Sequence, residues 1–395
     1  MKIAHVCPFY TPAIGGVKQV VEELAKRQIK AGHEVHVFTS DWDKEKRIKE
    51  KYEIIDKVHV HRCRHLFKIA NFVTIWPSVF SELMKHNFDI IHSHVFGHPH
   101  FVFASLAAKI KNTPHIHTTH CTWTDAYRSS AGRLGAAISY NFFSRIALKF
   151  TKKIIAITPW EFSFIKKYGG KQAQIINLPN GMDEIFFNKI KPNDFKTKHK
   201  IKPTDKIVLF FGRLNITKRP DNFVRIAKLI LKKIRQQKKD NLTFVICGPD
   251  EGLQQKVKQL IGNEKKILLL PPIRNRHEVA KMYQSAELYV LPSYREGLPL
   301  TIFEAMASGL PIVASPVNGV PFEIKDKENG FLIPYNNLQK YKDKILQLLD
   351  DDELRQKISK NNLKKARAYD WDVIFERMMG VYGDAVGKTL KTPNS

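Results

Sequence analysis

The stretch YREGLPLTIFEAMASGLP, Tyr294–Pro311, holds two carboxylates, Glu296 and Glu304, separated by seven residues. It predicts a helix over 299–308, because Pro299 favours a first helical turn. With a rise of about 1.5 Å per residue, the two backbones stand on the order of 10 Å apart. The carboxyl groups of a retaining glycosidase are about 5–5.5 Å apart, so this spacing speaks against such a pair. It favours two groups holding opposite ends of an elongated ligand, with the helix N-terminus between them facing an anion.

The composition is that of a large, strongly basic chain. Its 395 residues, with 65 Lys and Arg against 38 Asp and Glu, predict two or three domains and a net charge of +27. Such an excess favours anionic partners such as nucleic acid, phosphorylated substrates or an anionic membrane, although dispersed lysines also keep a chain soluble. Four cysteines without a C-x-x-C pair, and no signal peptide or long apolar run, predict a cytoplasmic protein.

The order of elements predicts an α/β fold. Short apolar strands alternate with amphipathic helices in both halves, which is typical of two doubly wound, Rossmann-like parallel sheets. We predict an N-terminal domain over 1–183, a linker rich in Lys, Pro and Asn over 184–205, a C-terminal domain over 206–370 and a final helical segment over 371–395 that packs back on the first domain. Ligands of such sheets bind at the carboxyl ends of strands.

Two loops that follow strands carry candidate binding groups. Gly15–Gly16 lets backbone N–H groups approach a phosphate or a sugar, although a simple turn would also use glycines. It is neither a dinucleotide fingerprint nor a Walker loop. After the strand 207–211, Gly212 is followed by Arg213 and Lys218, which suit a diphosphate. Solvated basic residues are the alternative, but cations beside a helix N-terminus oppose its dipole unless an anion is bound.

Histidines gather near two other predicted strand ends. His115 and His117 share one strand face and His120 follows in the loop, while His92 and His94 lie on the preceding strand. No carboxylate stands at ligand spacing and H-E-x-x-H is absent, so we expect no metal site and mostly structural histidines. His120 is the exception, because its loop is expected to open into an interdomain cleft.

Together these loops resemble the retaining GT-B glycosyltransferases of family 4, also called group 1 glycosyl transferases, along nearly the whole chain. The motifs that carry the resemblance are Gly15-Gly16-Val17, Ile91-His92-Ser93-His94, Thr119-His120, Pro179-Asn180-Gly181-Met182-Asp183, Gly212-Arg213-Leu214 with Lys218, Glu296-x7-Glu304 and Asn329-Gly330-Phe331-Leu332. Two positions depart from the family pattern. Lys18 stands where many relatives have an acid, and Phe322 interrupts the common Pro-Glu pair, leaving Glu323 one place late.

The resemblance implies a GT-B fold, with two Rossmann-like domains facing a central cleft. It implies transfer of a sugar from a UDP- or GDP-linked donor to an acceptor hydroxyl, with retention at the anomeric carbon. The N-terminal domain would bind the acceptor, a lipid or a glycan precursor, and the C-terminal domain would bind the donor. The donor is a substrate, and neither a metal nor another cofactor is implied.

The resemblance also implies roles for individual residues. Arg213 and Lys218 would bind the diphosphate, Glu304 the ribose, and Glu296 the transferred sugar. His120 would lie beside the reacting sugar carbon, so the implied catalytic residues are His120, Glu296, Arg213 and Lys218. The implied donor-binding residues are Gly15, Gly16, Gly212, Arg213, Lys218, Glu296, Gly297, Leu298, Leu300 and Glu304.

A basic-aromatic segment lies in the N-terminal half. Ile138, Phe142, Ile146 and Phe150 recur every four residues, with several basic residues nearby, and the segment 66–79 adds Phe67, Phe72, Ile75 and Trp76. Helices of this kind can lie on anionic membranes, so a peripheral membrane contact is one interpretation. An apolar face packed against the N-terminal sheet is the other.

Two further classes of function remain open from the sequence. The net charge of +27 would fit a nucleic-acid-binding protein, but the charge is mostly dispersed lysine and no nucleic-acid-binding module is present, so we expect no such partner. A nucleotide-sugar epimerase or another enzyme on the same fold would share the nucleotide pocket, and the fold cannot decide between them.

Overall fold

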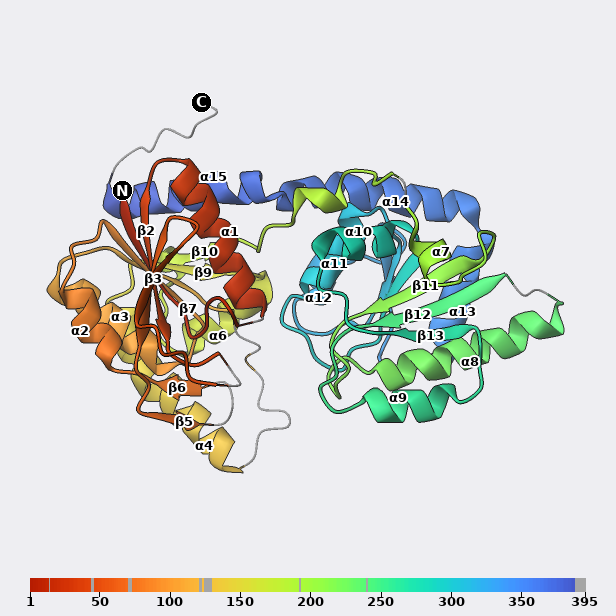
Figure 1. The fold of residues 1–395 in the computed structure, drawn as a ribbon, viewed down its shortest axis with the longest axis horizontal. Coiled ribbons are helices and arrows are strands. Elements are labelled where there is room, and N and C mark those ends of the chain that lie inside the picture. Colours follow the sequence, from red (N-terminus) through yellow and green to blue (C-terminus); the bar gives the residue numbers. More distant parts are fainter. Residues whose placement is uncertain are drawn as a thin grey trace. The chain divides into compact units, whose positions relative to one another are not determined.

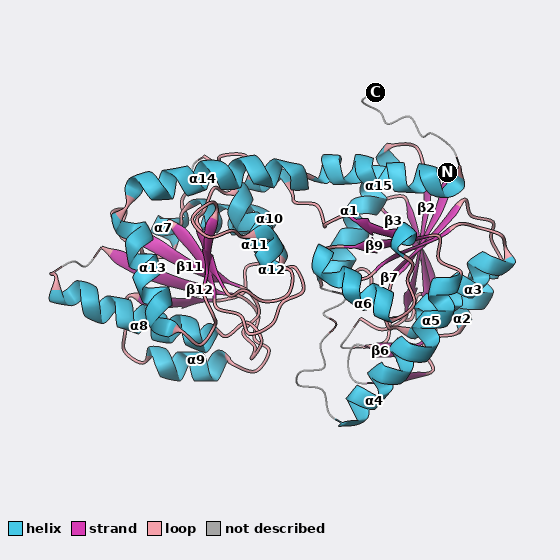
Figure 2. Cartoon of the chain, turned by 180° about the vertical axis from the view of Figure 1, so that it is seen from behind, coloured by secondary structure: helices cyan, strands magenta, loops and turns pink. Residues whose placement is uncertain are grey.

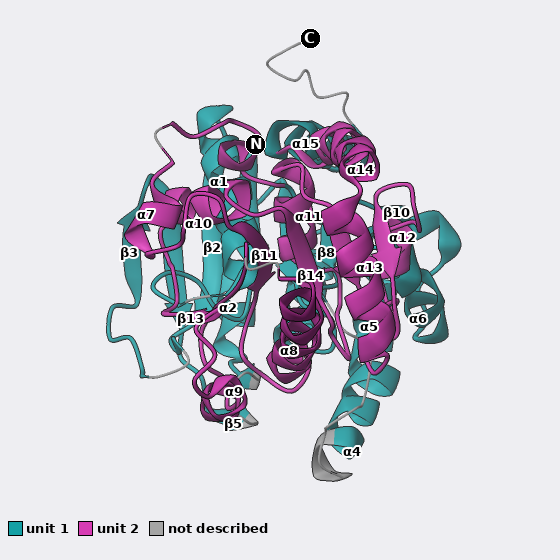
Figure 3. Cartoon of the chain, turned by 90° about the vertical axis from the view of Figure 1, so that its right-hand side faces the viewer, with its two compact units in different colours: residues 1–181, 371–395 teal, residues 182–370 magenta. Residues whose placement is uncertain are grey.

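The computed structural model describes residues 1–13, 15–43, 46–69, 73–120, 123, 130–191, 193–238 and 241–387. It divides into two compact units, shown in different colours in Figure 3. The first unit comprises Met1–Gly181 and Trp371–Ser395, and the second comprises Met182–Asp370. Residues 388–395, which end the final segment expected from the sequence, lie outside the described part.

The first unit is built on an eight-stranded sheet with the order β10-β9-β8-β7-β1-β2-β4-β3 (Figure 1). Its strands are β1 (Lys2–Val6), β2 (Glu34–Ser40), β3 (Tyr52–Ile55), β4 (Val58–Cys63), β7 (Ile90–His94), β8 (His115–Thr118), β9 (Lys153–Ala156) and β10 (Ile175–Asn177). All neighbours pair in parallel except the edge strand β3, which is antiparallel to β4. A separate hairpin joins β5 (Phe67–Ile69) to β6 (Val73–Ile75).

Helices cover both faces of this sheet. They are α1 (Gly16–Lys30), α2 (Ser78–Met84), α3 (Pro99–Ile110), α4 (Ser130–Ile138), α5 (Ser144–Lys149), α6 (Phe162–Lys167) and α15 (Trp371–Val386), with a π-helical turn η1 (Ser139–Phe143) between α4 and α5. On one face, α1 and α15 bury Leu24 and Tyr382 against Ile3 and Ile90. On the other, α2 and α3 cover Ala4, Val6 and Ile91. The C-terminal helix α15 therefore completes the core of the first unit.

The second unit is a six-stranded parallel sheet with the order β13-β12-β11-β14-β15-β16. Its strands are β11 (Lys206–Phe211), β12 (Leu242–Cys247), β13 (Ile267–Leu270), β14 (Leu288–Leu291), β15 (Ile312–Ala314) and β16 (Gly330–Leu332). Its helices are α7 (Phe195–Lys198), α8 (Pro220–Gln236), α9 (Gln254–Ile261), α10 (Arg276–Gln284), α11 (Leu300–Ala307), α12 (Val320–Glu323), α13 (Leu338–Asp350) and α14 (Asp352–Ala366). Figure 2 shows the helices and strands in different colours.

The segment 184–205, expected to be a linker, is a packed part of the second unit. Phe186 and Phe195 are buried within it, and the amide of Ile190 donates to Oε1 of Gln284 on α10 at 2.9 Å. Its polar composition concealed these few apolar anchors. The chain instead passes between the units after Gly181, where a Cβ atom would stand 2.2 Å from the ring of Trp371.

The two Rossmann-like α/β units confirm the predicted fold class. Parallel strands need long crossover connections, and helices that supply them cover both faces of each sheet. Within the described residues, no helix combines the length and the apolarity that a membrane crossing needs.

Candidate functional site

The loop after β11 presents Lys218 at the carboxyl end of the second sheet. The Oδ1 atom of Asn215 accepts hydrogen bonds from the amides of Thr217 and Lys218 at 3.2 and 3.0 Å. Arg219 then adopts a left-handed conformation with φ 55°, just before α8 begins. This side-chain-capped turn holds Lys218 close to the sheet edge instead of leaving it in solvent.

Lys218 and Glu296 form a buried ion pair in the second unit. The Nζ atom of Lys218 lies 2.6 Å from both carboxylate oxygens of Glu296, and these side chains are 11% and 5% exposed. Ser293 donates to Oε1 of Glu296 at 2.6 Å, and Asn318 donates to the backbone carbonyl of Glu296. An ammonium has three donors, so one N–H of Lys218 remains for a further acceptor.

The helix that contains Glu304 begins one residue later than predicted. Pro299 has extended backbone angles and lies just before α11, which runs over Leu300–Ala307. Pro299 gives the helix no side-chain cap, so the first amides of α11 can donate to a bound anion. Glu296 lies on the loop before the helix, as predicted, and Glu304 lies about one turn inside it.

Glu304 is held by two donors from α10. Arg276 Nη1 lies 2.6 Å from Oε1 of Glu304, and the hydroxyl of Tyr283 donates to Oε2 at 3.0 Å. Arg276 also pairs with Asp183, with Nη2 at 2.6 Å from its Oδ2. Each oxygen of Glu304 accepts one of these bonds, so each keeps a lone-pair site for another donor. Two hydroxyl groups of a ligand could occupy those sites.

The charges around Glu304 set the protonation of its partners. Burial acts to lower the pKa of Arg276, but Glu304 and Asp183 outweigh it and raise the pKa above its ordinary value. Burial, together with the nearby Glu304 carboxylate, raises the pKa of Tyr283 well above its usual range. Both groups therefore keep their protons and act only as donors to Glu304.

Arg213 lies at a more exposed position of the same edge. Its Nη1 atom lies 3.1 Å from both carboxylate oxygens of Glu251, which follows β12. The two side chains are 56% and 43% exposed. A surface pair of this kind contributes only about 0–1 kcal/mol. Arg213 can therefore leave Glu251 for a more highly charged partner at little cost.

Two members of this site, Arg276 and Tyr283, were not predicted from the sequence, and Asp183 was named only within a family motif, without a role. Arg276 opens the helix that follows β13, so the carboxyl-end rule that found Arg213 and Lys218 also covers it.

Glu323, in contrast, belongs to the interior of the second unit. Its carboxylate accepts from the Tyr369 hydroxyl and pairs with Lys365 at 3.1 Å. The side chain is therefore committed to these contacts within the unit.

In the first unit, Gly15 and Gly16 form the start of α1. Both are exposed, and Gly15 provides no side-chain cap for the helix. Lys18, the departure from the family pattern, pairs with Glu22 at 2.7 Å along the helix. The first turn of α1 contains no acidic residue, so its free amides can face an anion at the carboxyl end of β1.

His120 lies just after β8 and has an unusual backbone conformation. Its φ is 42°, an unusual value for a residue with a side chain. The preceding Thr119 donates its hydroxyl to the buried carboxylate of Glu161 at 2.9 Å, and Trp123 donates its indole N–H to the same carboxylate at 2.9 Å. Burial raises the pKa of Glu161 to about 7. This carboxyl group thus anchors Trp123 and Thr119, the residue directly before His120.

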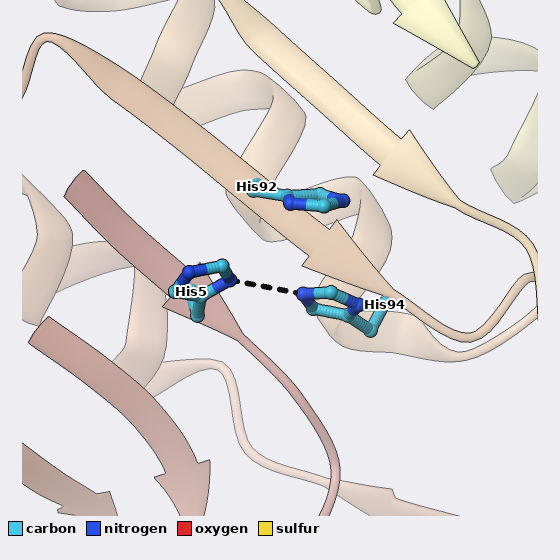
Figure 4. A group of neighbouring side chains, drawn as sticks. All are labelled: His5, His92 and His94. Atoms are coloured by element: carbon cyan, nitrogen blue, oxygen red, sulfur yellow. Dashed lines mark hydrogen bonds between the residues drawn. The ribbon is translucent and has the colours of Figure 1, made fainter. Parts of the chain in front are cut away.

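Behind His120, the first unit contains a chain of buried histidines. His120 Nε2 lies 3.3 Å from Nδ1 of His94, and His94 Nε2 lies 3.1 Å from Nδ1 of His5 (Figure 4). The ligand atoms of His5, His92 and His94 could all approach one metal ion. However, both ring nitrogens of His92 are hydrogen-bonded, to Tyr382 and Thr118. Because these ring nitrogens of His92 are engaged, the chemistry of this group favours hydrogen bonding.

Comparison with known proteins identifies the family. Residues 192–365 match the family model for glycosyl transferases group 1, and residues 14–185 match the model for glycosyltransferase family 4. A UDP-Gal:alpha-D-GlcNAc-diphosphoundecaprenol alpha-1,3-galactosyltransferase of Escherichia coli is 30% identical over 300 residues, which cover 73% of each chain. The chain belongs to the group 1 glycosyltransferases.

Two other relatives of this glycosyltransferase also match most of the chain. An uncharacterized glycosyltransferase of Methanocaldococcus jannaschii is 28% identical over 97% of this chain and 98% of its own. A D-inositol 3-phosphate glycosyltransferase of Corynebacterium diphtheriae is 27% identical over 78% and 73% of the two chains. The enzyme class predicted from the sequence, a glycosyltransferase, is therefore confirmed.

Solved structures establish the GT-B fold of this glycosyltransferase. Anabaena HepE in complex with UDP superposes with a TM-score of 0.75 at 18% identity, over 97% of this chain and 100% of its own. Sucrose-phosphate synthase from Thermosynechococcus elongatus gives a TM-score of 0.74 at 19% identity, over 98% and 99% of the chains. The predicted fold is confirmed over nearly the full length.

Proposed function

We propose that this glycosyltransferase moves a sugar from a nucleoside-diphosphate sugar to an acceptor hydroxyl, with retention at the anomeric carbon. The observation that carries the proposal is the arrangement around α11. Glu296 and Glu304 lie on either side of an uncapped helix N-terminus, and Lys218 is paired with Glu296. A carboxylate at each end and positive charge between them match a sugar, a diphosphate and a ribose in that order.

In this proposal Arg213 and Lys218 bind the diphosphate, with Gly212 allowing close approach of the loop. Glu304 accepts hydrogen bonds from the ribose hydroxyls through the lone pairs that Arg276 and Tyr283 leave free. Glu296 holds the transferred sugar. The amides of Gly297, Leu298 and Leu300 contact the distal phosphate and that sugar. The proposal assigns Gly15, Gly16 and His120 of the first unit to the same donor.

The proposed step separates a negatively charged diphosphate from an oxocarbenium-like sugar. Preorganised positive charge on the leaving group is expected to contribute most to lowering the barrier of such a reaction. Arg213, Lys218 and the α11 N-terminus supply it, so the proposal gives no role to a metal or another cofactor. The acceptor hydroxyl attacks the face from which the diphosphate departs, and a phosphate oxygen takes its proton. Anabaena HepE complexes with UDP and UDP-glucose support a nucleotide-sugar donor in this fold.

The test is a screen of UDP- and GDP-sugars by thermal shift, followed by transfer assays with the best donor. A ligand at about 100 times its dissociation constant stabilises a protein by about 2.7 kcal/mol, which is readily detected. Anomeric configuration is read from the product by NMR. Omitting the acceptor separates transfer from epimerisation, because an epimerase converts the donor without it. The absence of both donor binding and transfer across the screen would contradict the proposal.

We further propose that the acceptor is lipid-linked and that the enzyme contacts the anionic cytoplasmic leaflet. Four large apolar side chains around α4 and η1 are strongly exposed: Leu134 (64%), Ile138 (49%), Phe142 (60%) and Phe143 (44%). The π-helical turn Ser139–Phe143 adds a residue to the helical repeat. The apolar residues predicted to share one face, from Ile138 to Phe150, therefore do not all point in the same direction. Tyr140, Ala147 and Leu148 pack inward instead, in the core cluster behind it.

Basic residues accompany this exposed patch, which supports the membrane interpretation over simple packing on the sheet. Arg145 and Lys149 are exposed on α5, and Leu66 and Phe67 are 65% and 54% exposed near the β5–β6 hairpin. Trp76, also expected to take part, is only 1% exposed and belongs to the core. Phe72 lies outside the described residues.

A double substitution, Leu134→Ser with Phe142→Ser, should lower binding to anionic vesicles at about 0.15 M salt by at least tenfold. Each side chain is worth about 1.5–3 kcal/mol when fully buried in an apolar phase. Co-sedimentation with phosphatidylglycerol vesicles measures the loss. Ile54→Ser is the matched control, because Ile54 is 59% exposed on the edge strand β3. Equal binding by the wild type and the double variant, or no binding by either, would contradict the membrane contact.

A further inference from the structure

The buried histidines of the first unit form a linear chain that ends at His120. His5 comes from β1, His94 from the neighbouring β7, and His120 follows β8. Figure 4 shows His5 and His94 pointing at each other across the two strands. Gln28 of α1 closes the inner end of the chain, because its Oε1 atom lies 2.8 Å from Nε2 of His5.

The side-chain carbonyl of Gln28 determines which ring nitrogen carries the proton in each of these histidines. A carbonyl oxygen only accepts, so His5 must carry its proton on Nε2, which leaves Nδ1 of the neutral ring bare. His94 then donates from Nε2 to His5 and keeps a bare Nδ1. His120 must donate from Nε2 to that atom. Each proton position follows from the previous one, over the contacts of 2.8, 3.1 and 3.3 Å.

We propose that Gln28, His5 and His94 form a positioning relay that fixes His120 in its Nε2–H tautomer and so presents a bare Nδ1 as a hydrogen-bond acceptor. The nitrogen of the same side-chain amide supports this polarity, since Nε2 of Gln28 donates to the hydroxyl of Tyr382 at 3.4 Å. That hydroxyl lies 2.7 Å from Nδ1 of His92, to which it can donate in turn. The orientation of the Gln28 amide is therefore anchored from both sides.

The relay needs uncharged rings, and the interior of the first unit provides them. Gln28, His5 and His94 are 0% exposed, and within the described part of the chain no ionised side chain is hydrogen-bonded to any of the three. Burial lowers the pKa of His5 and of His120 to about 4. Burial and the neighbouring histidines also lower the pKa of His94. At neutral pH each ring thus has one donor and one acceptor.

The chemical consequence is a choice between two kinds of ligand contact. With a bare Nδ1, His120 accepts a hydrogen bond from a hydroxyl of the sugar or of the acceptor. The assignment of that ligand rests on the proposed function, but the tautomer itself does not. The same residue with a proton on Nδ1 would instead donate to a carbonyl or phosphate oxygen. Gln28, His5 and His94 would thus act on the reaction only through His120.

The test reads the tautomer directly in the full-length chain by NMR with ¹⁵N-labelled histidine side chains. The His120 signals are assigned by their loss in His120→Gln. The wild type should show the Nε2–H form, and Gln28→Met, which removes the acceptor at the far end, should lower the ratio of the two tautomers by roughly three- to tenfold, the effect of one hydrogen bond. Gln28→Lys, which places a donor there, should shift His120 toward the Nδ1–H form.

His94→Phe cuts the relay in the middle and should give the same loss of preference as Gln28→Met. The matched control is His115→Phe. His115 is equally buried at 0% exposure, but it is hydrogen-bonded to Ser93 and Thr151, which are not members of the relay. A wild-type Nδ1–H tautomer, or a His120 tautomer unchanged in both Gln28→Met and His94→Phe, would overturn the relay. So would an equal change in the control.

Transfer assays on the same variants separate this inference from the proposed function. Gln28→Met should lower kcat about three- to tenfold and leave the donor KM unchanged, because it alters only the acceptor character of His120. If no nucleotide sugar is turned over by the wild type, the proposed function fails while the tautomer result still decides the relay.

Discussion

Lys218→Met is expected to lower kcat for sugar transfer by about 10²–10³-fold, the range seen when one preorganised donor is removed from a catalytic site. Lys218 Nζ lies 2.6 Å from Glu296 in a largely buried position, so its charge is little screened by water. Arg276 cannot take its place, because Glu304 and Asp183 hold it. Arg213 already makes its own contact with the diphosphate in the proposed site, so it does not replace the lost charge. Steady-state transfer assays with the donor found by the screen measure the loss.

Stability must be separated from catalysis in this experiment, because Lys218→Met leaves Glu296 buried without its cation. Breaking a buried pair in this way costs about 3–5 kcal/mol. The double variant Lys218→Met with Glu296→Gln removes the unpaired charge, so it should regain stability but not activity.

Lys266→Met is the control for the loss of a buried lysine. Lys266 pairs with Asp205 at 3.0 Å, and the two side chains are 14% and 3% exposed in the same unit. This variant should lose a similar free energy of unfolding and keep its kcat. A Lys218→Met enzyme with a near-normal kcat would contradict the proposed donor site.

Acid is expected to unfold the first unit at about pH 5, well before the second unit. His5, His100 and His115 are fully buried, and burial lowers their pKa values to about 4, 4 and 3. The unfolded chain binds protons at these rings below about pH 6.5, whereas the folded unit does not. Stability is therefore fully present above pH 6.5 and is lost as the pH falls toward 4.

The magnitude of this effect follows from proton linkage. At pH 5 each of the three rings lowers the free energy of unfolding by about 2 kcal/mol, and together they lower it by about 6 kcal/mol. Net stabilities of domains are about 5–15 kcal/mol. Burial also lowers the pKa values of His92, His94 and His117, which adds to the loss. Of the 16 histidines, only His199 and His277 belong to the second unit, so that unit lacks this sensitivity.

The intact chain carries its own reporter for this experiment. All five tryptophans, Trp42, Trp76, Trp123, Trp160 and Trp371, belong to the first unit. Tryptophan fluorescence should change near pH 5, while far-UV circular dichroism retains the signal of the second unit. His100→Gln, which removes one titrating ring, should move the fluorescence midpoint to lower pH, and His277→Asn should leave it in place. Unchanged fluorescence down to pH 4 would contradict the burial of neutral histidines.

The sequence predicted the second unit better than the first. Glu296, Glu304, Arg213 and Lys218 all follow strands or open helices, and the parallel topology brings such positions to one sheet edge. Their positions relative to the predicted strands and helices were therefore enough to predict that they lie at one edge of the sheet. Which groups pair could not be predicted, because Lys218 and Glu296 are 78 residues apart and meet only through the crossover connections. The same holds for Arg276 and Glu304.

Composition misled in two places for the same physical reason. The segment 184–205 has little apolar periodicity, yet Phe186, Phe195 and Ile201 are enough to bury it in the second unit. Around residues 138–150, a regular four-residue pattern predicted one apolar face, but the π-helical turn Ser139–Phe143 shifted the register. A few apolar contacts decide whether a polar segment is buried, and one extra residue in a helical turn decides which side chains face the core. Neither can be recognised from the hydrophobic periodicity of the sequence.

By itself, the sequence determined the two Rossmann-like folds, the family and the positions of the carboxylates on either side of the α11 N-terminus. Those properties depend on local periodicity and on motifs short enough to be read along the chain. The tertiary structure alone decided the partners of Glu304, the burial of the Lys218–Glu296 pair and the order of Gln28, His5, His94 and His120. Each of these depends on the side chains that neighbouring strands and helices bring within hydrogen-bond distance, and such neighbours are set by packing, not by sequence separation.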